Sequence, residues 1–245
     1  MFRRLLARLR TDPDLPRPAP PVAVIGDLHG RADLLERMLA RLAAEPGAAS
    51  ARRIFVGDLI DRGPDTAAVL ARVHALCTRD PARTICLMGN HERMMLDFLD
   101  DPSGAGPLWI ANGGAETLVS FGVNPWGRHD LPGQAEALRA AAGQTLLDWL
   151  AALPLFWSEG ALAVTHAGAD PARPLADQSP DRLLWGPRGR EGARRDGLWV
   201  AQGHRVVAQP RAEAGRIMVD TGAWHSGTLT AAWLDTGGLR FLDVR

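Results

Sequence analysis

Three short apolar runs alternate with helical patterns in the first 100 residues. The runs are Val22–Ile25, Arg53–Val56 and Thr84–Met88, and each is followed by a glycine and a polar residue. Apolar positions at helical spacing follow each run, most clearly within 31–45. A strand, a loop and a helix repeated three times are typical of βαβ units and predict a largely parallel sheet.

The middle of the chain has a different pattern. Helical periodicity is interrupted there by glycines and prolines, and the predicted helices are Trp109–Phe121, Gln134–Ala142 and Thr145–Leu153. We interpret residues 105–153 as a helical insertion beside the sheet. No independent domain is expected in this segment.

Strand patterns return in the last third of the chain. The predicted strands are Leu162–Thr165, Leu198–Gln202, Ile217–Asp220, Thr228–Leu234 and Leu239–Val244. A hairpin loop is expected between the last two, and a second, mainly antiparallel sheet packed on the first would contain all five. The expected fold class is α/β, with two packed sheets flanked by helices.

The start of the chain is basic and rich in proline. Residues 1–20 are predicted to be a lead-in, and residues 21–245 a single domain. No apolar run approaches the roughly 20 residues of a membrane-spanning helix, and Cys77 and Cys86 are too few to staple a domain of this size. We therefore expect a cytoplasmic protein with reduced thiols and no integral membrane segment.

Composition excludes several classes of function. All 28 basic residues are arginine, so lysine-dependent chemistry, as in P-loop NTPases, protein kinases and pyridoxal enzymes, is ruled out. No G-x-S-x-G nucleophile elbow occurs. The 28 basic and 28 acidic residues give a net charge of zero, and without a basic stripe no nucleic-acid partner is expected.

Candidate metal ligands stand where the predicted strands end. They are Asp27, His29, Asp58, Asn90, His166 and His204. In open α/β sheets, ligands bind at the carboxyl ends of the strands because the loops converge there. Carboxylate, amide and imidazole donors suit manganese, iron or zinc, and the absence of nearby cysteine argues against a structural zinc site.

The motifs around these residues resemble a known family. GDLHG (26–30), GDLIDRG (57–63) and GNHE (89–92) are followed by single histidines in THAG (165–168) and GH (203–204). This ordered set is similar to the phosphoprotein phosphatase branch of the calcineurin-like metallophosphoesterases. More narrowly, it resembles the compact bacterial and phage serine/threonine protein phosphatases, whose fold is a four-layer α/β/β/α sandwich.

The resemblance implies a site with two divalent metal ions. Asp27 and His29 would bind the first ion, and Asp58 would bridge both. The remaining implied ligands of the second ion are Asn90, His166 and His204. Manganese is the expected metal, with iron or zinc as alternatives.

The resemblance also implies the catalytic and phosphate-binding residues. His91 would be the general acid, oriented by Asp61, while Arg62 would bind the phosphate together with Asn90. For the second phosphate-binding arginine, Arg188 is our choice and Arg190 the alternative.

The predicted function is metal-dependent hydrolysis of a phosphomonoester by a metal-activated water that attacks phosphorus in line. The main expectation is a serine/threonine protein phosphatase, with a phosphorylated protein or a small phosphoester as substrate. The alternative is a symmetrical diadenosine tetraphosphate hydrolase or another phosphoesterase of the superfamily; that hydrolase usually carries Asp where Glu92 stands. A binding module built on an inactive site and a nuclease are disfavoured, and the oligomeric state stays open.

We expect Glu92 to cap its helix and Asp220 to support the His204 loop.

Overall fold

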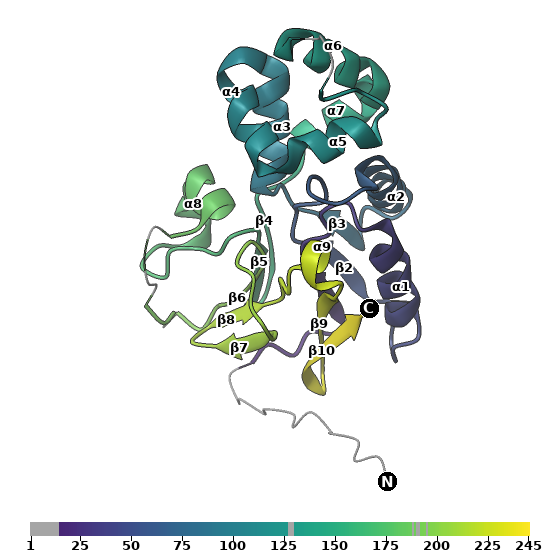
Figure 1. Cartoon of the computed structure of the whole chain (residues 1–245). Coiled ribbons are helices and arrows are strands. Elements are labelled where there is room, and N and C mark those ends of the chain that lie inside the picture. The colour runs from purple at the N-terminus through teal and green to yellow at the C-terminus, as the bar shows by residue number, and fades with distance from the viewer. Residues whose placement is uncertain (1–14, 127–129, 188, 190–191, 195) are drawn as a thin grey trace.

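Two five-stranded β-sheets form the centre of the protein, as the computed structural model shows (Figure 1). The structure describes residues 15–126, 130–187, 189, 192–194 and 196–245. The first sheet has the order β10-β9-β1-β2-β3 and consists of β1 (Val22–Ile25), β2 (Arg52–Phe55), β3 (Thr84–Cys86), β9 (Leu229–Asp235) and β10 (Gly238–Val244). The second has the order β4-β5-β6-β8-β7 and consists of β4 (Phe156–Glu159), β5 (Leu162–Thr165), β6 (Trp199–Gln202), β7 (Arg211–Glu213) and β8 (Arg216–Met218).

The three N-terminal strands are parallel, as the apolar runs predict. The C-terminal hairpin corrects the sequence-based expectation, because β9 pairs antiparallel with β1 and so extends the first sheet. Six successive residues of β9 are buried, which requires cover on both faces of that strand. The second sheet is also not mainly antiparallel: β5 pairs parallel with β6, and β6 with β8. Only its edge strands β4 and β7 are antiparallel to their neighbours.

Side chains that alternate along the strands build separate cores on the two faces of each sheet. Val24 and Ile54 from the first sheet meet Val164 and Ile217 from the second in the core between the sheets. The opposite face of the first sheet packs against helices α1 (Ala32–Ala43) and α2 (Thr66–Arg79). Leu183 of α8 (Pro180–Trp185) covers the outer face of the second sheet. The resulting layers are those of an α/β/β/α sandwich.

Helices fill the chain between β3 and β4 and gather at one end of the sandwich (Figure 1). They are α3 (Asn90–Asp100), α4 (Pro102–Trp109), a π-helical turn (Ile110–Gly114), α5 (Ala115–Ser120), α6 (Leu131–Ala142) and α7 (Gln144–Ala151). The expected helix 109–121 is therefore the end of α4, the π turn and α5. Among the helices of the described ranges, none is long and apolar enough to cross a bilayer.

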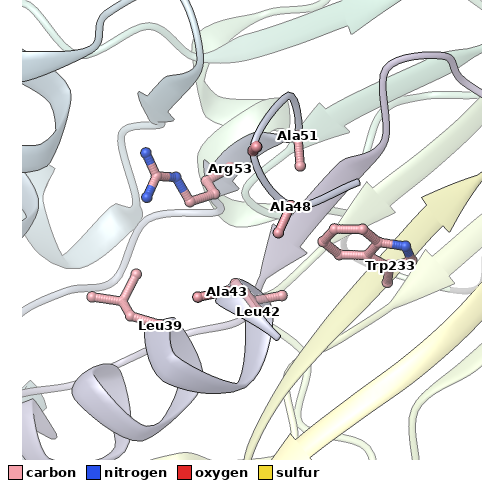
Figure 2. Close-up of a pocket in the computed structure, with 8 residues that line it drawn as sticks. Leu39, Leu42, Ala43, Ala48, Ala51, Arg53 and Trp233 are labelled. Carbon is pink, nitrogen blue, oxygen red and sulfur yellow. The ribbon is translucent and has the colours of Figure 1, made fainter. Parts of the chain in front are cut away.

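A pocket of about 270 Å³ opens between α1, β2 and β9 (Figure 2). Leucine, alanine and Trp233 line it, and Arg53 and Trp233 lie on opposite sides of Ala48 (Figure 2). The guanidinium of Arg53 donates to Thr84 Oγ1 at 2.8 Å. None of the candidate ligands lines this pocket, so the chemistry lies elsewhere.

Candidate active site

The carboxyl ends of five strands bring the candidate ligands together. Asp27 and His29 follow β1, Asp58 follows β2, and Asn90 begins α3 directly after β3. The two remaining histidines, His166 and His204, follow β5 and β6. The carbonyl oxygen of Asp58 accepts the N–H of His29 at 2.9 Å, which ties the first two loops to each other.

Asn90, His166 and His204 place three donor atoms at one point. Asn90 Oδ1 lies 2.9 Å from His166 Nε2 and 2.9 Å from His204 Nδ1. Ligands about 2.1 Å from one octahedral ion are roughly 3 Å apart, so this spacing fits a shared cation. Asp58 Oδ1 lies 3.4 Å from His166 Nε2, within reach of the same ion.

The protonation of His166 strengthens this interpretation. Its Nδ1 lies 3.0 Å from Val56 O, and because a carbonyl can only accept, Nδ1 carries the proton. Burial lowers the pKa of His166, so the ring is neutral and Nε2 presents a lone pair. That lone pair faces the carbonyl oxygen of Asn90, and two acceptors at 2.9 Å repel each other unless a cation lies between them.

A second group of donors lies on the other side of Asp58. His29, Asp58 and His91 each offer an atom within 4.8 Å of the others, and Asp58 also belongs to the group with His166 and His204. His29 Nδ1 donates to Ile60 O at 2.7 Å, so its Nε2 carries the lone pair that can bind a cation. Asp58 is thus the residue that the two groups share, which is the position of a bridging ligand.

Asp27 lies beside these groups without belonging to either. Its carboxylate accepts the backbone N–H of His204, at 3.0 Å to Oδ2. Gly203 makes this approach possible, because a Cβ there would lie 1.9 Å from Asp27 Oδ1. The role of Asp27 as a ligand of the first ion therefore stays a prediction.

Burial and charge make the site ready for cations. Burial raises the pKa of Asp27, and the nearby carboxylates of Asp220 and Asp58 raise it further. Burial lowers the pKa of His29 to about 3 and of His204 to about 4, so both rings are neutral near pH 7. Buried carboxylates next to neutral imidazoles form a donor set that can hold a divalent ion. The residues of this site therefore fit such ions.

Arg62 and His91 sit beside the donor groups. Arg62 Nη1 lies 3.1 Å from His29 Nε2, and Arg62 Nη2 lies 3.0 Å from His91 Nε2. His91 Nδ1 lies 2.6 Å from Asp61 Oδ2. Burial lowers the pKa of His91, but the carboxylates of Asp58 and Asp61 raise it more, so it stands above 6.5. The imidazolium of His91 can therefore deliver a proton near neutral pH.

Two residues for which the sequence predicted no such role donate hydrogen bonds to the carboxylate of Asp61. Trp109 Nε1 donates to Asp61 Oδ2 at 3.0 Å, and Thr117 Oγ1 donates to Oδ1 at 2.7 Å. Both come from the helical segment between β3 and β4, and both are fully buried. Trp109 thus holds the Asp61 carboxylate in place. It reaches this carboxylate because of the way the chain crosses from α4 to α5.

Glu92 caps its helix as expected and does more. Its carboxylate accepts the N–H of Gly89 at 2.9 Å, the capping contact at the start of α3. It also accepts the N–H groups of Asp58 and Leu59. Asp220 supports the His204 loop through its backbone, because its carbonyl accepts the N–H of Val207.

The backbone is unusual at five of the predicted site residues. Their φ angles lie in the left-handed region: His29 (42°), Asp58 (50°), Asp61 (70°), Arg62 (68°) and His204 (62°). Non-glycine residues rarely adopt this conformation, and it clusters at functional sites. Arg188 and Arg190 lie outside the described residues, so their predicted role is not addressed by the structure.

This fold and donor set define a metal-dependent phosphoesterase, and comparison with known proteins identifies the family. The chain matches the family described as calcineurin-like phosphoesterase over residues 20–211, and it belongs to this family. Its members bind two divalent metal ions, and the chain supplies candidate ligands for them. The resemblance drawn from the motifs is therefore confirmed.

Relatives with two kinds of activity are similar to the chain. The symmetrical bis(5'-nucleosyl)-tetraphosphatase of Dechloromonas aromatica is 35% identical over 173 residues, which cover 68% of this chain and 52% of that protein. The chain thus spans about half the length of this relative. Serine/threonine-protein phosphatase 1 of Salmonella typhimurium is 30% identical over 224 residues, covering 86% of the chain and 90% of that protein.

A solved structure shares the fold over nearly the whole chain. The crystal structure of a candidate diadenosine tetraphosphatase superposes with a TM-score of 0.66 at 21% identity, covering 94% of this chain and 96% of that one. At this identity the likeness concerns the fold alone, and it confirms the two mixed sheets flanked by helices.

Proposed function

We propose that the chain hydrolyses phosphoric anhydrides and esters at a centre of two divalent ions, with symmetrical dinucleoside tetraphosphates as its preferred substrates. The observation that carries the metal centre is the meeting of Asn90 Oδ1, His166 Nε2 and His204 Nδ1. Asp58 lies between this group and the one containing His29. Asp27, predicted as the further ligand of the first ion, lies beside both.

Each catalytic residue has a distinct task. Two bound ions supply Lewis-acid polarisation of the phosphoryl group and make water acidic enough to attack near neutral pH. Arg62 binds the phosphoryl oxygens and stabilises the charge that develops on them. As the bond from water oxygen to phosphorus forms, the bond to the leaving oxygen breaks, and His91 Nε2 gives its proton to that oxygen. Asp61 keeps His91 protonated and oriented through the contact at Nδ1.

Sequence similarity supports the tetraphosphate substrate. Several relatives are symmetrical bis(5'-nucleosyl)-tetraphosphatases, including those of Dechloromonas aromatica at 35% and Ralstonia nicotianae at 34% identity. Symmetrical cleavage of diadenosine tetraphosphate would give two ADP molecules. Because these alignments cover about half of each relative, their substrate is a proposal for this chain.

A phosphoserine or phosphothreonine protein is the second candidate substrate. The alignment with serine/threonine-protein phosphatase 1 covers 90% of that relative, far more than the alignment with the tetraphosphatases does. Glu92 also follows the protein phosphatase motif. The two candidates share every step of the chemistry and differ only in the leaving group.

Manganese is the proposed metal, with iron and zinc as alternatives. The ligands are carboxylate, amide and imidazole, and nitrogen–oxygen donor sets of this kind suit all three. Metal analysis of the purified protein, with activity after addition of each ion to the metal-free protein, tests this proposal.

Side-by-side kinetics test the substrate. The manganese-loaded protein is given diadenosine tetraphosphate, a phosphoserine peptide and p-nitrophenyl phosphate, and the products are separated by chromatography. We expect the highest kcat/KM for the dinucleotide, with ADP as sole product. ATP with AMP, or preference for the peptide, would reject the first candidate.

A variant tests the metal centre itself. Asp58→Asn removes the shared carboxylate, so we expect metal content to fall and turnover to drop by about a thousandfold or more. Asp148→Asn, an exposed change on α7, is the matched control and should leave both unchanged. An active Asp58→Asn enzyme without metal would refute the proposed chemistry.

A further inference from the structure

Two adjacent glycines, Gly113 and Gly114, end the π-helical turn between α4 and α5. Gly113 has φ 107° and ψ 14°, a conformation that departs from the helical backbone around it. Turns of this kind are rare inside helices and often lie at functional sites. Neither glycine has a side chain that could take part in the chemistry, so their place in the turn needs another reason.

Gly113 lies directly against Arg62. Its carbonyl oxygen accepts the backbone N–H of Arg62 at 3.2 Å. A Cβ on Gly113 would lie 2.8 Å from both the backbone nitrogen and Cγ of Arg62, well inside the spacing of non-bonded atoms. Glycine is therefore the residue that lets the turn contact Arg62 at its backbone and at the start of its side chain.

Gly114 gives similar room to Trp109. A Cβ on Gly114 would lie 2.5 Å from Cδ2 of the Trp109 ring, so the ring packs on the glycine backbone. Trp109 Nε1 donates to Asp61 Oδ2 at 3.0 Å. Beyond the turn, Thr117 Oγ1 accepts the backbone N–H of Asp61 at 3.0 Å. Residues on both sides of the turn thus hold Asp61, and the turn itself contacts the next residue, Arg62.

The loop after β1 restricts the same segment. A Cβ on Gly63 would lie 2.0 Å from the carbonyl oxygen of His29, so the backbone next to Arg62 already touches that loop. Arg62 also has a φ of 68°, and a non-glycine residue keeps such a conformation only where its surroundings enforce it. A side chain on Gly113 would push on Arg62, and its guanidinium would leave its position 3.0 Å from His91 Nε2.

We propose that Gly113 is a positioning residue for Arg62, because the glycine backbone of the π-helical turn fixes where the guanidinium meets the phosphoryl group. The inference rests on the proposed function for the role of Arg62 on phosphoryl oxygens, whereas the contact between the two residues does not depend on it. The turn thereby makes the helical segment between β3 and β4 part of the catalytic apparatus. A change in this segment alters turnover without touching a metal ligand.

Gly113→Ala tests the contact, with p-nitrophenyl phosphate as the substrate because its leaving group needs no general acid. In the manganese-loaded protein, kcat/KM should fall about tenfold or more, since misplaced groups lose much of their effect, while metal content should match the wild type. Wild-type kcat/KM in this variant would overturn the proposal.

Gly122→Ala is the matched control. Gly122 also has a positive φ, 74°, and a Cβ there would meet nothing within 4 Å in the described part of the chain. Both variants place a side chain on a positive-φ backbone and should be less stable in urea for that reason. The control should keep kcat/KM within about twofold, and a loss equal to that of Gly113→Ala would overturn the proposal.

Arg62→Ala decides whether the loss acts through the arginine. Alone, it should lower kcat/KM for p-nitrophenyl phosphate about a hundredfold. Adding Gly113→Ala should lower it by less than a further twofold or so, because effects that act through one contact are not additive. A further tenfold loss in the double variant would overturn the proposal.

Histidine NMR signals of the metal-free protein test the position of Arg62 without catalysis. The Nε2 signals of His29 and His91, which lie next to the guanidinium, should shift more in Gly113→Ala than that of His166, which lies next to Asn90. Unchanged His29 and His91 signals in the folded variant would overturn the proposal. If these signals shift but Arg62→Ala keeps wild-type turnover, the positioning stands and the proposed role of Arg62 in catalysis falls.

Asn112→Ala is a milder variant that decides the question if Gly113→Ala does not fold. Asn112 Nδ2 donates to the carbonyl of Leu108 at 2.9 Å and so closes the turn. Its loss loosens the turn without adding a clash, and kcat/KM should fall about two- to fivefold. The same change in the Arg62→Ala background should have no effect, and equal losses in both backgrounds would overturn the proposal.

Discussion

The carboxylate of Glu92 accepts the backbone N–H of Asp58 at 2.9 Å. The same carboxylate accepts from Leu59 and Gly89 and is fully buried. One side chain at the start of α3 therefore fixes the loop after β2, which carries the shared candidate ligand. A Cβ on Gly89 would lie 2.2 Å from Asp58 Oδ1, so glycine is needed where these two segments meet.

Glu92→Gln should destabilise the metal-free protein by about 2–3 kcal/mol, because an amide cannot accept all three N–H groups. Glu92→Asp is shorter by one methylene group and should lose about 1–2 kcal/mol, since it cannot reach both segments. Urea unfolding measures both values. Glu116→Gln, exposed on α5, is the control, and wild-type stability of Glu92→Gln would contradict this role.

His91→Gln should act mainly on substrates with poor leaving groups. A serine alkoxide needs a proton as it leaves, so turnover of a phosphoserine peptide should fall by about 10²–10⁴. Turnover of p-nitrophenyl phosphate should fall less than about tenfold, because nitrophenolate leaves without a proton. Equal losses in steady-state kinetics with the two substrates would show that His91 is not the general acid.

The pH profile of the poor substrate should report the contact between His91 and Asp61. A general acid must be protonated, so turnover should fall as pH rises through a pKa above 6.5. Asp61→Asn removes a carboxylate that raises the pKa of His91, and the fall should move to lower pH. Wild-type and variant profiles that coincide would contradict this relationship.

Trp224 should keep Arg62 in place. It lies on α9 (Ala223–Ser226), its ring centroid is 5.5 Å from Arg62 Cζ, and it is 41% exposed. Trp224→Ala should lower kcat/KM roughly two- to fivefold for all substrates, and Trp224→Phe should restore most of it. Trp126→Ala, at a more exposed tryptophan, is the control. A loss limited to one substrate would indicate substrate contact instead.

Asp220 should make the stability of the metal-free protein depend on pH. Burial raises its pKa to about 6, so the folded state holds a proton that the unfolded state releases near pH 3.8. Its contribution is complete below pH 3.8 and is lost as pH rises toward 6. Relative to Asp220→Asn, the wild type should lose as much as about 3 kcal/mol across this window. Urea unfolding at several pH values measures the difference, and a constant difference would contradict it.

Local patterns predicted most of the first sheet and the meeting of the ligands. Buried parallel strands such as Val22–Ile25 are continuous apolar runs, and their polar C-terminal neighbours must share one edge of the sheet. The place of β9 was not predictable in this way, because its pairing with β1 joins residues about 200 positions apart. β4 is an exposed edge strand and lacks the apolar run that marks a buried one.

The supports of the site were harder to predict than its ligands. Trp109 and Thr117 reach Asp61 only because the chain turns between α4 and α5, and no motif surrounds them. Arg211 and Arg216 line one pocket only because β7 and β8 pair with each other. Such packing across strands leaves no spacing signal along the sequence.

The left-handed backbone at five site residues lowers the stability of the folded protein at the positions that its activity requires. Each such residue costs about 1–2 kcal/mol, which glycine would recover at positions such as Asp61 and Arg62. Glycine at either position would relax the backbone only by removing a side chain that the site needs, so this strain is retained together with the chemistry.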